Sequence, residues 1–286
     1  MRIAALLTCH NRRLKTLECL SRLHACTLEP GDALSVFLVD DGSTDGTAAA
    51  VAEQFPAVQV IAGDGNLFWN GGMRTAFAAA MAQGFDAYIW LNDDTMLYPD
   101  ALRTLRNSGL AQPGPGIAVG ATCDPHTGVL TYGGLVSLAW HSPHYYVHLP
   151  VAEHAQPCRT LNGNCVWIPA SVAAAVGNLD PVFVHAIGDW DYGFRAARLG
   201  FKLWQAPGFV GECSQNPVQA ESLADRANIR LQWRKVCSPK RIPPRAWRSF
   251  VRRHYGLLWP LYFLRPYLAV LARGLVAKSR LLLGRA

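Results

Sequence analysis

Short apolar runs alternate with helical patterns through the first 125 residues, and this alternation restricts the fold more than any other feature. The runs expected to form strands lie at residues 3–8, 35–39, 58–62, 87–91 and 117–121. Helical patterns lie between them, at residues 14–24, 47–54, 73–83 and 99–107. Strand–helix units of this kind join parallel strands, so the pattern predicts an α/β fold with a mainly parallel, Rossmann-like sheet flanked by helices.

The pattern changes twice further along the chain. Residues 123–158 are rich in Gly, His, Tyr and Pro with weak alternation, which predicts short antiparallel strands or a loop. Helices are expected at 169–176 and 191–199. After residue 224 the chain becomes helical, aromatic and arginine-rich, with Pro243-Pro244 as the expected linker. We therefore expect two domains, residues 1–225 and a basic helical appendage at residues 226–286.

The charge of the chain is divided between these two parts. Residues 1–225 hold 12 Lys and Arg against all 20 Asp and Glu, a net charge of −8. Residues 226–286 hold the other 15 basic residues and no acidic one. This asymmetry predicts that the tail meets an anionic partner, either lipid headgroups or nucleic acid. A solvated basic face is the alternative.

The cysteines and the N-terminus bear on the compartment. The eight cysteines include no C-x-x-C pair and no framework spacing, so neither a zinc site nor a disulfide scaffold is expected. The apolar run at residues 3–8 is too short for a signal peptide and leads into a polar segment. We expect reduced thiols in a protein that is not secreted.

Acidic residues collect where two of the expected strands end. The second strand runs into Asp40-Asp41-Gly42-Ser43-Thr44-Asp45, and the fourth runs into Asn92-Asp93-Asp94-Thr95. Loops at the carboxyl ends of parallel strands converge on one crevice, where ligands bind. Carboxylates gathered there repel one another unless a cation or donor groups hold them. Taken singly, each segment also fits a turn followed by a helix cap.

Further motifs follow in an order that resembles the family 2 glycosyltransferases of the GT-A fold, over residues 2 to about 217. The likeness rests on segments from both halves of this region, namely residues 7–12, 39–45, 66–72, 91–95, 161–165, 176–180 and 189–195. Residues 66–74 and 90–95 are most similar to bacterial members that add rhamnose or related sugars to surface polysaccharides. The resemblance implies transfer of rhamnose or another hexose, with inversion, from a nucleotide-diphosphate donor to a hydroxyl of a saccharide or lipid-linked saccharide acceptor.

The resemblance also implies residues for the donor side. Asp94 is expected to bind Mg²⁺ or Mn²⁺, with Asp93 on the metal, its water shell or the ribose. Asn92 stands where the family's first aspartate would, which removes one negative charge. An acidic contact at Asp41 favours UDP or dTDP, because it accepts the imide N–H of uracil or thymine. The full set of expected donor contacts is Thr8, Asn11, Arg12, Asp40, Asp41, Gly71, Gly72, Arg74 and Asp93.

The Gly71-Gly72 pair is expected to lead into a helix whose N-terminus faces the pyrophosphate, with Arg74 in reach. A plain helix start with a solvated arginine is the alternative. Late in the domain, family members often supply a histidine to the metal. This chain has Gly211-Glu212-Cys213-Ser214 there, so either Glu212 or Cys213 substitutes or the ligand is absent.

On the acceptor side, Asp189 matches the family's catalytic base, which must lie within hydrogen-bond reach of the attacking hydroxyl. Gly188 stands where the family has Glu. Asp191 is expected to orient Asp189 or to cap the following helix. The other expected acceptor-side residues are Asn162, Gly163, Asn164 and Trp190.

The tail alternates Arg and Lys with aromatic and aliphatic residues. Its longest apolar stretch is broken by Pro260, Arg265 and Pro266, so it falls short of the ~20 residues that span a bilayer. Helices lying in the headgroup plane of an anionic membrane surface fit better, which predicts a cytoplasmic protein held peripherally at the inner face of the cell membrane. Packing of the tail against the catalytic domain or a second subunit is the alternative.

Other classes of protein fit less well. A nucleotidyltransferase needs a Gly-rich first loop, which residues 8–15 lack, and a dehydrogenase needs G-x-G-x-x-G after the first strand. A nucleotide- or nucleic-acid-binding non-enzyme that uses the basic tail is the remaining alternative. The net negative charge of residues 1–225 gives it no support, and no nucleic-acid partner is expected.

Overall fold

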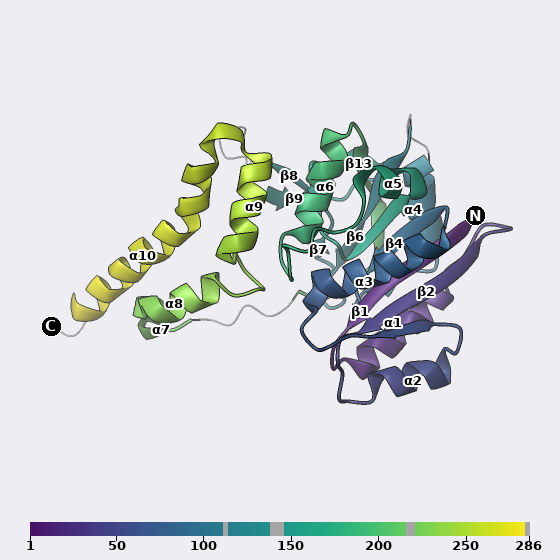
Figure 1. Cartoon of the computed structure of the whole chain (residues 1–286), viewed down its shortest axis with the longest axis horizontal. Coiled ribbons are helices and arrows are strands. Elements are labelled where there is room, and N and C mark those ends of the chain that lie inside the picture. The colour runs from purple at the N-terminus through teal and green to yellow at the C-terminus, as the bar shows by residue number, and fades with distance from the viewer. Residues whose placement is uncertain (111–113, 138–145, 216–220, 284–286) are drawn as a thin grey trace. The chain divides into compact units, whose positions relative to one another are not determined.

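The computed structural model describes residues 1–110, 114–137, 146–215 and 221–283 (Figure 1). The chain divides into two compact units. The N-terminal unit comprises Met1–Pro181 and Gly188–Gln215, and the C-terminal unit comprises Val182–Ile187 and Asn216–Ala286. Relative to the expected boundary, residues 182–187 and 216–225 fall in the C-terminal unit.

The N-terminal unit is built on one large sheet with the strand order β10-β13-β6-β12-β4-β1-β2-β3. β4, β1, β2 and β3 are parallel, β12 runs antiparallel between β4 and β6, and β13 is parallel to β6. Two short strands pair at its margin, β5 with β13 and β7 with β6. The bounds are β1 (Arg2–Cys9), β2 (Ala33–Asp40), β3 (Gln59–Ala62), β4 (Ala87–Leu91), β5 (Met96–Leu97), β6 (Gly116–Cys123), β7 (Leu130–Tyr132), β10 (Gln156–Pro157), β12 (Cys165–Pro169) and β13 (Lys202–Glu212).

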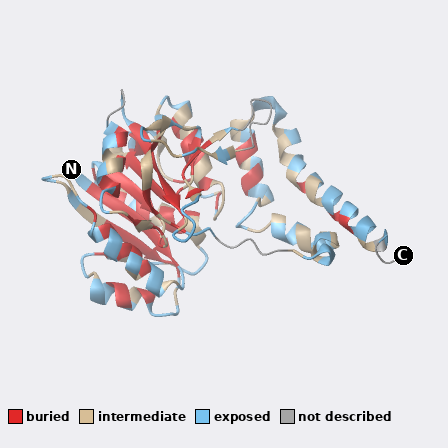
Figure 2. Ribbon diagram, turned by 180° about the vertical axis from the view of Figure 1, so that it is seen from behind, coloured by how far each residue is buried: buried red, intermediate tan, exposed pale blue. Residues whose placement is uncertain are grey.

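Helices cover both faces of this sheet, so its central strands are apolar throughout (Figure 2). Alternate residues of β1 point to opposite faces: Leu7 joins the core under α1 and α4, while Leu6 joins the core under α3 and α6. Each buried side chain of this size contributes ~1.5–3 kcal/mol. The bounds are α1 (Arg13–His24), α2 (Thr47–Gln54), α3 (Phe68–Gln83), α4 (Ala101–Leu110), α5 (Ala170–Val176) and α6 (Gly188–Arg198).

The predicted α/β class with a mainly parallel central sheet is confirmed, but one helix start was wrong. The helix expected from residue 73 begins at Phe68, so Gly71 and Gly72 lie inside α3 and do not form a loop ahead of it. Both glycines are buried, and a Cβ at Gly72 would overlap the Thr8 side chain at the end of β1. Gly72 is therefore needed for close packing of α3 on β1.

The region of residues 123–158 forms short antiparallel strands, one of the two predicted outcomes; residues 138–145 of that prediction lie outside the described residues. A small sheet with the order β11-β8-β9 combines β8 (Gly134–Ser137), β9 (Tyr146–His148) and β11 (Thr160–Leu161).

The C-terminal unit is helical: α7 (Leu223–Ala227), α8 (Ile229–Val236), α9 (Pro244–His254), the 3₁₀ turn η1 (Gly256–Leu258) and α10 (Trp259–Leu283). The expected linker Pro243-Pro244 is confirmed only in part, because the connection from α8 ends at Pro243 and Pro244 already belongs to α9. Pro243 is the N-cap of α9 and Pro244 occupies its first turn, because a proline lacks only an N–H that has no partner there. α10 continues through Pro266. It packs on the other helices through Tyr267 beside Trp233, with ring centroids 5.6 Å apart, and through a bond from Trp247 to the Tyr262 carbonyl.

Among the described residues, every helix is too short or too polar to cross a membrane. This agrees with the broken apolar stretch of the tail sequence.

Candidate active site

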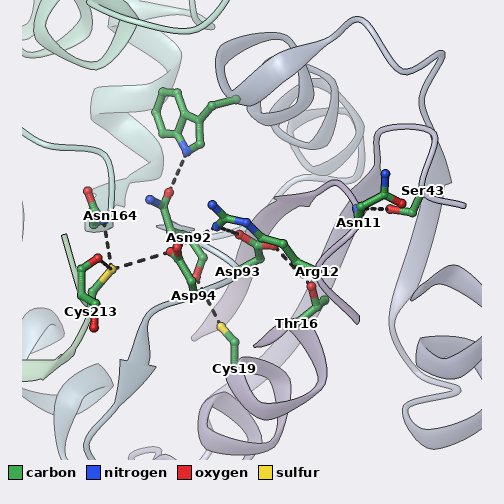
Figure 3. A network of polar contacts seen from close by, with 12 residues as sticks. Asn11, Arg12, Thr16, Cys19, Ser43, Asn92, Asp93, Asp94, Asn164 and Cys213 are labelled. Atoms are coloured by element: carbon green, nitrogen blue, oxygen red, sulfur yellow. Dashed lines mark hydrogen bonds and ion pairs between the residues drawn. The ribbon is translucent and has the colours of Figure 1, made fainter. Parts of the chain in front are cut away.

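The carboxyl ends of β1 and β4 bring Arg12 against Asp93 and Asp94 (Figure 3). The Arg12 Nη1 donates to Asp93 Oδ1 at 3.1 Å and to Asp94 Oδ2 at 2.6 Å. Both carboxylates are largely buried, with side-chain exposures of 7% and 13%. One guanidinium therefore bridges two adjacent acids, a contact that the sequence analysis did not predict.

Asp93 is the more perturbed of the two acids. Burial raises the pKa of its carboxyl to about 6, the neighbouring Asp94 charge adds to the effect, and Arg12 opposes it. The Thr16 hydroxyl donates to Asp93 Oδ2 at 3.3 Å. Sequence reasoning missed Thr16; its place on the first turn of α1, four residues after Arg12, is the signal that would have pointed to it.

The carboxylate oxygens of Asp93 and Asp94 suit a divalent cation for which the protein supplies only part of the coordination shell. Among the described residues, no group of three or more His, Cys, Asp or Glu can hold a metal ion. Asp94 and Asp93 nevertheless supply the hard oxygen ligands that Mg²⁺ and Mn²⁺ prefer, and such ions usually complete their shell with substrate phosphates and water.

Of the two candidates for the late metal ligand, Cys213 faces Asp94. Figure 3 shows its Sγ between Asp94 and Asn164, 3.6 Å from Asp94 Oδ1 and 3.6 Å from Asn164 Nδ2. Glu212 instead accepts a bond from the Tyr98 hydroxyl. Burial, with the charge of Asp94 adding to it, raises the pKa of the Cys213 thiol to about 12. In its neutral form the thiol donates to Asp94.

Asn92 occupies the position where the family has an aspartate, and the structure gives a reason for the amide. Asn92 Oδ1 accepts a 2.6 Å bond from the Trp69 indole N–H. A carboxylate there would place a third negative charge beside Asp93 and Asp94, with Arg12 as the bridging cation. The amide accepts the same bond without that cost.

Asp41 holds the loop between β3 and α3. Its carboxylate accepts backbone N–H bonds from Gly65 at 2.9 Å, Leu67 at 3.2 Å and Phe68 at 2.9 Å. Phe68 has a φ of 53°, which costs energy in a non-glycine residue. Three of the roughly four acceptor positions of the carboxylate are thus used, which leaves about one for a nucleobase. The predicted nucleobase contact stays a prediction.

The other expected donor contacts tie loops together. Asp40 accepts from Ser43 N at 2.9 Å, and Asn11 Oδ1 accepts from Thr44 N at 2.7 Å. The first bond closes the turn after β2, and the second fixes that turn against the loop after β1. Arg74 lies within α3, partly buried, and its carbonyl accepts from Asn178.

Asp189 lies in the first turn of α6, where two backbone N–H groups hold its carboxylate. Gly163 N donates to Oδ2 at 3.0 Å and Trp190 N donates to Oδ1 at 2.9 Å. Burial raises the pKa of Asp189 to about 6, against the effect of these bonds. A Cβ at Gly163 would overlap the Trp69 ring. Gly163 therefore connects Asp189 to Trp69 and, through it, to Asn92.

Gly188 departs from the family's glutamate for a steric reason. A Cβ at Gly188 would overlap the amide oxygen of Asn70, a fully buried residue of α3. The Asn70 Nδ2 donates to the Asp180 carbonyl at 3.3 Å. Only glycine fits beside Asn70. No sequence pattern points to Asn70 beyond its place next to the glycine pair.

The remaining acceptor-side residues fall in two groups. Asp191 is fully buried and pairs with Arg195 at 2.8 Å, an arrangement that favours a structural role over contact with an acceptor. Asn162 bonds to His148, and Asn164 is buried behind Asp94 with its carbonyl accepting from Asn92 N. Trp190 is partly buried with its ring beside Tyr146, at a centroid distance of 5.2 Å.

Comparison with known proteins bears directly on this arrangement. Residues 5–126 match the family described as Glycosyl transferase family 2. Two curated relatives are the N-acetylglucosaminyl-diphospho-decaprenol L-rhamnosyltransferases of Mycobacterium tuberculosis strains CDC 1551 / Oshkosh and ATCC 25618 / H37Rv. Each is 25% identical over 193 residues, 59% of this chain and 62% of the relative. The match thus spans about three fifths of the relatives' length.

Two solved structures share the fold. The mannosyltransferase PcManGT from Pyrobaculum calidifontis, in complex with GDP-Man and Mn²⁺, is 17% identical with a TM-score of 0.52, over 99% of this chain and 79% of that one. TarS of S. aureus is 11% identical with a TM-score of 0.55, over 90% and 44%. Such low identities support the fold alone. The family match over residues 5–126 and the curated relatives support membership of this chain in the family 2 glycosyltransferases.

Proposed function

We propose that this glycosyltransferase moves rhamnose or another hexose from a UDP or dTDP donor to a hydroxyl of a saccharide or lipid-linked saccharide, in the assembly of a cell-surface polysaccharide or glycolipid. One observation carries the proposal. A continuous set of contacts joins Asp41 through Phe68 and Trp69 to Asn92, the neighbour of Asp93 and Asp94, and through Gly163 to Asp189. The rhamnosyltransferase activity in the name of the curated relatives supports the choice of sugar.

On the donor side, Asp94 and Asp93 are the residues that would hold Mg²⁺ or Mn²⁺. When bound, the dication neutralises charge that develops on the departing nucleoside diphosphate. Arg12, which now bridges the two carboxylates, is a second cation at the same place and offers N–H donors suited to phosphate. The Asp41-held loop positions the start of α3 beside these groups.

On the acceptor side, Asp189 takes the proton of the attacking hydroxyl. The hydroxyl oxygen bonds to the anomeric carbon while the bond from that carbon to the nucleoside diphosphate breaks and the diphosphate leaves. A base whose pKa is raised to about 6 is ionised at neutral pH yet more basic than an ordinary aspartate. The Gly163 and Trp190 N–H groups fix the carboxylate in place. Attack from the face opposite the leaving group gives inversion.

The basic tail supports a peripheral position at the cytoplasmic face of the cell membrane, with residues 1–225 as the catalytic part. The name of the curated relatives includes a decaprenol-linked substrate, and such a lipid carrier keeps an acceptor at a membrane surface. Residues 226–286 carry basic and aromatic residues and no acid, a composition suited to anionic headgroups.

A panel of UDP-, dTDP- and GDP-sugars, including dTDP-rhamnose, tests the donor class through release of nucleoside diphosphate with and without Mg²⁺ or Mn²⁺. We expect metal-dependent turnover of a UDP- or dTDP-sugar, and Asp189→Asn should lose turnover but still bind the donor. Asp100→Asn serves as a control, since this acid pairs with Arg103 on the exposed side of α4. Turnover in the Asp189→Asn protein would remove Asp189 from the base role.

A further inference from the structure

The C-terminal unit contains a hollow that the proposed sugar transfer does not use. It has a volume of about 490 Å³ and lies between the first turns of α9 and the early part of α10. Three of the side chains that line it are arginines. Its lining residues are Pro244, Arg245, Arg248, Ser249, Arg252 and Phe263.

The three arginines lack acidic neighbours. Arg245, Arg248 and Arg252 follow one another at spacings of three and four, which puts them on one face of α9, where like charges repel. Among the described residues, none of the three forms an ion pair with an acid. The sequence of residues 226–286 contains no acid at all. The first turn of α9, with its positive helix end, also has no acidic residue.

Apolar and aromatic groups border the arginines. Phe263 lines the hollow, and the Arg248 guanidinium lies 5.9 Å from the centre of the Trp259 ring. Large apolar side chains beside these aromatics in sequence are open to solvent, with Leu257 98% exposed and Leu261 66% exposed. The C-terminal unit therefore carries this triple positive charge together with exposed leucines on η1 and α10.

We propose that this arginine hollow binds the phosphate of a membrane lipid, with the exposed leucines of η1 and α10 in the adjoining hydrocarbon. The inference deepens the proposed membrane association and rests on it. Guanidinium groups bind phosphate oxygens in a bidentate manner, which a lysine cannot reproduce. A free phosphate would use the arginines but leave the leucines in water, so a phosphate that carries a hydrocarbon chain fits the whole surface.

Flotation of the full-length protein with vesicles tests the site. The vesicles are phosphatidylcholine alone, or mixed with phosphatidic acid or phosphatidylserine at matched surface charge. The test variant is R245Q/R248Q/R252Q, and the matched control, R273Q/K278Q/R280Q, removes the same charge from the distal part of α10. We expect the test variant to lose at least about tenfold in affinity for phosphatidic acid vesicles, and the control about threefold or less. A lysine triple at the three arginines should also lose most of the preference for phosphatidic acid.

Each other outcome has a definite meaning. Equal losses in the two glutamine triples would overturn the site and leave diffuse membrane attraction standing, whereas no binding of the wild type to any anionic vesicle would overturn both. The lipid assignment would be overturned if inorganic pyrophosphate competes fully with vesicles and the double variant Leu257→Ser/Leu261→Ser binds vesicles as well as the wild type. The lipid assignment would also be overturned if the protein binds duplex DNA and the test variant loses that binding while the control variant keeps it. Asp189→Asn should bind vesicles like the wild type, so a failed transfer proposal does not affect this result.

Discussion

Acid should slow this enzyme at a pH where an ordinary aspartate base would still be ionised, because burial raises the pKa of Asp189 to about 6. The base acts only when deprotonated. With that pKa, ~90% of Asp189 is ionised near pH 7 and ~10% near pH 5, so kcat/KM should fall about tenfold between them. A base with the ordinary aspartate pKa of 3.8 would lose less than about 10% of its activity over the same interval.

The assay measures release of nucleoside diphosphate from the accepted sugar nucleotide between about pH 4.5 and 8, with donor binding measured separately at each pH. Separate binding data are needed because burial also raises the pKa of Asp93 to about 6, and that group lies on the donor side. We expect the acidic limb in the turnover of bound donor. A rate that stays flat from about pH 7 to 5, or an Asp189→Asn protein that retains both turnover and the limb, would refute the reasoning.

Three further changes test the packing of the site. Because the pKa of Asp93 is raised in the folded chain, the wild type loses about 3 kcal/mol of unfolding free energy as pH rises from about 3.5 to 7. Asp93→Asn has no carboxyl to ionise, so urea titration should show its stability rising by that amount relative to the wild type over the same interval. A difference that stays constant with pH would contradict the raised pKa. Trp69→Phe removes the bond to Asn92 and should cost ~1–2 kcal/mol, whereas an unchanged midpoint would show that the bond contributes nothing. Gly188→Ala should cost ~1–3 kcal/mol through its overlap with Asn70, and Asn70→Ala in the same chain should recover part of that loss; strictly additive effects in this cycle would exclude the steric explanation.

Much of the N-terminal unit follows from local sequence. The apolar runs that became β1 and β4 are buried on both faces, so composition and length alone predict them. The placement of Arg12, Asp93 and Asp94 at one edge of the sheet follows from the rule that parallel strands present their carboxyl ends there.

Features set by tertiary contacts escaped prediction. The early start of α3 depends on the Asp41 carboxylate, which binds the Phe68 N–H from a distant loop and holds Phe68 at a positive φ. The glycine at position 188 reflects the Asn70 side chain from another helix. No local pattern contains either contact.

The tail shows the same limit. Pro243-Pro244 has the composition of a linker, yet proline is equally suited to the first turn of a helix, and packing decided between them. Pro266 would end an isolated helix, but α10 continues through it, with Tyr267 beside Trp233 of α8. Spacing alone also gave no reason to expect Arg245, Arg248 and Arg252 around one hollow.

We propose that the Asp93–Asp94 pair binds a nucleoside diphosphate through a dication while Asp189 serves only the acceptor. Calorimetric titration of UDP, dTDP and GDP, each with and without Mn²⁺, tests it most directly. We predict that UDP or dTDP binds only with the metal, that Asp94→Asn abolishes this binding and that Asp189→Asn leaves it unchanged. Binding that is independent of metal, or that survives Asp94→Asn, would contradict the account.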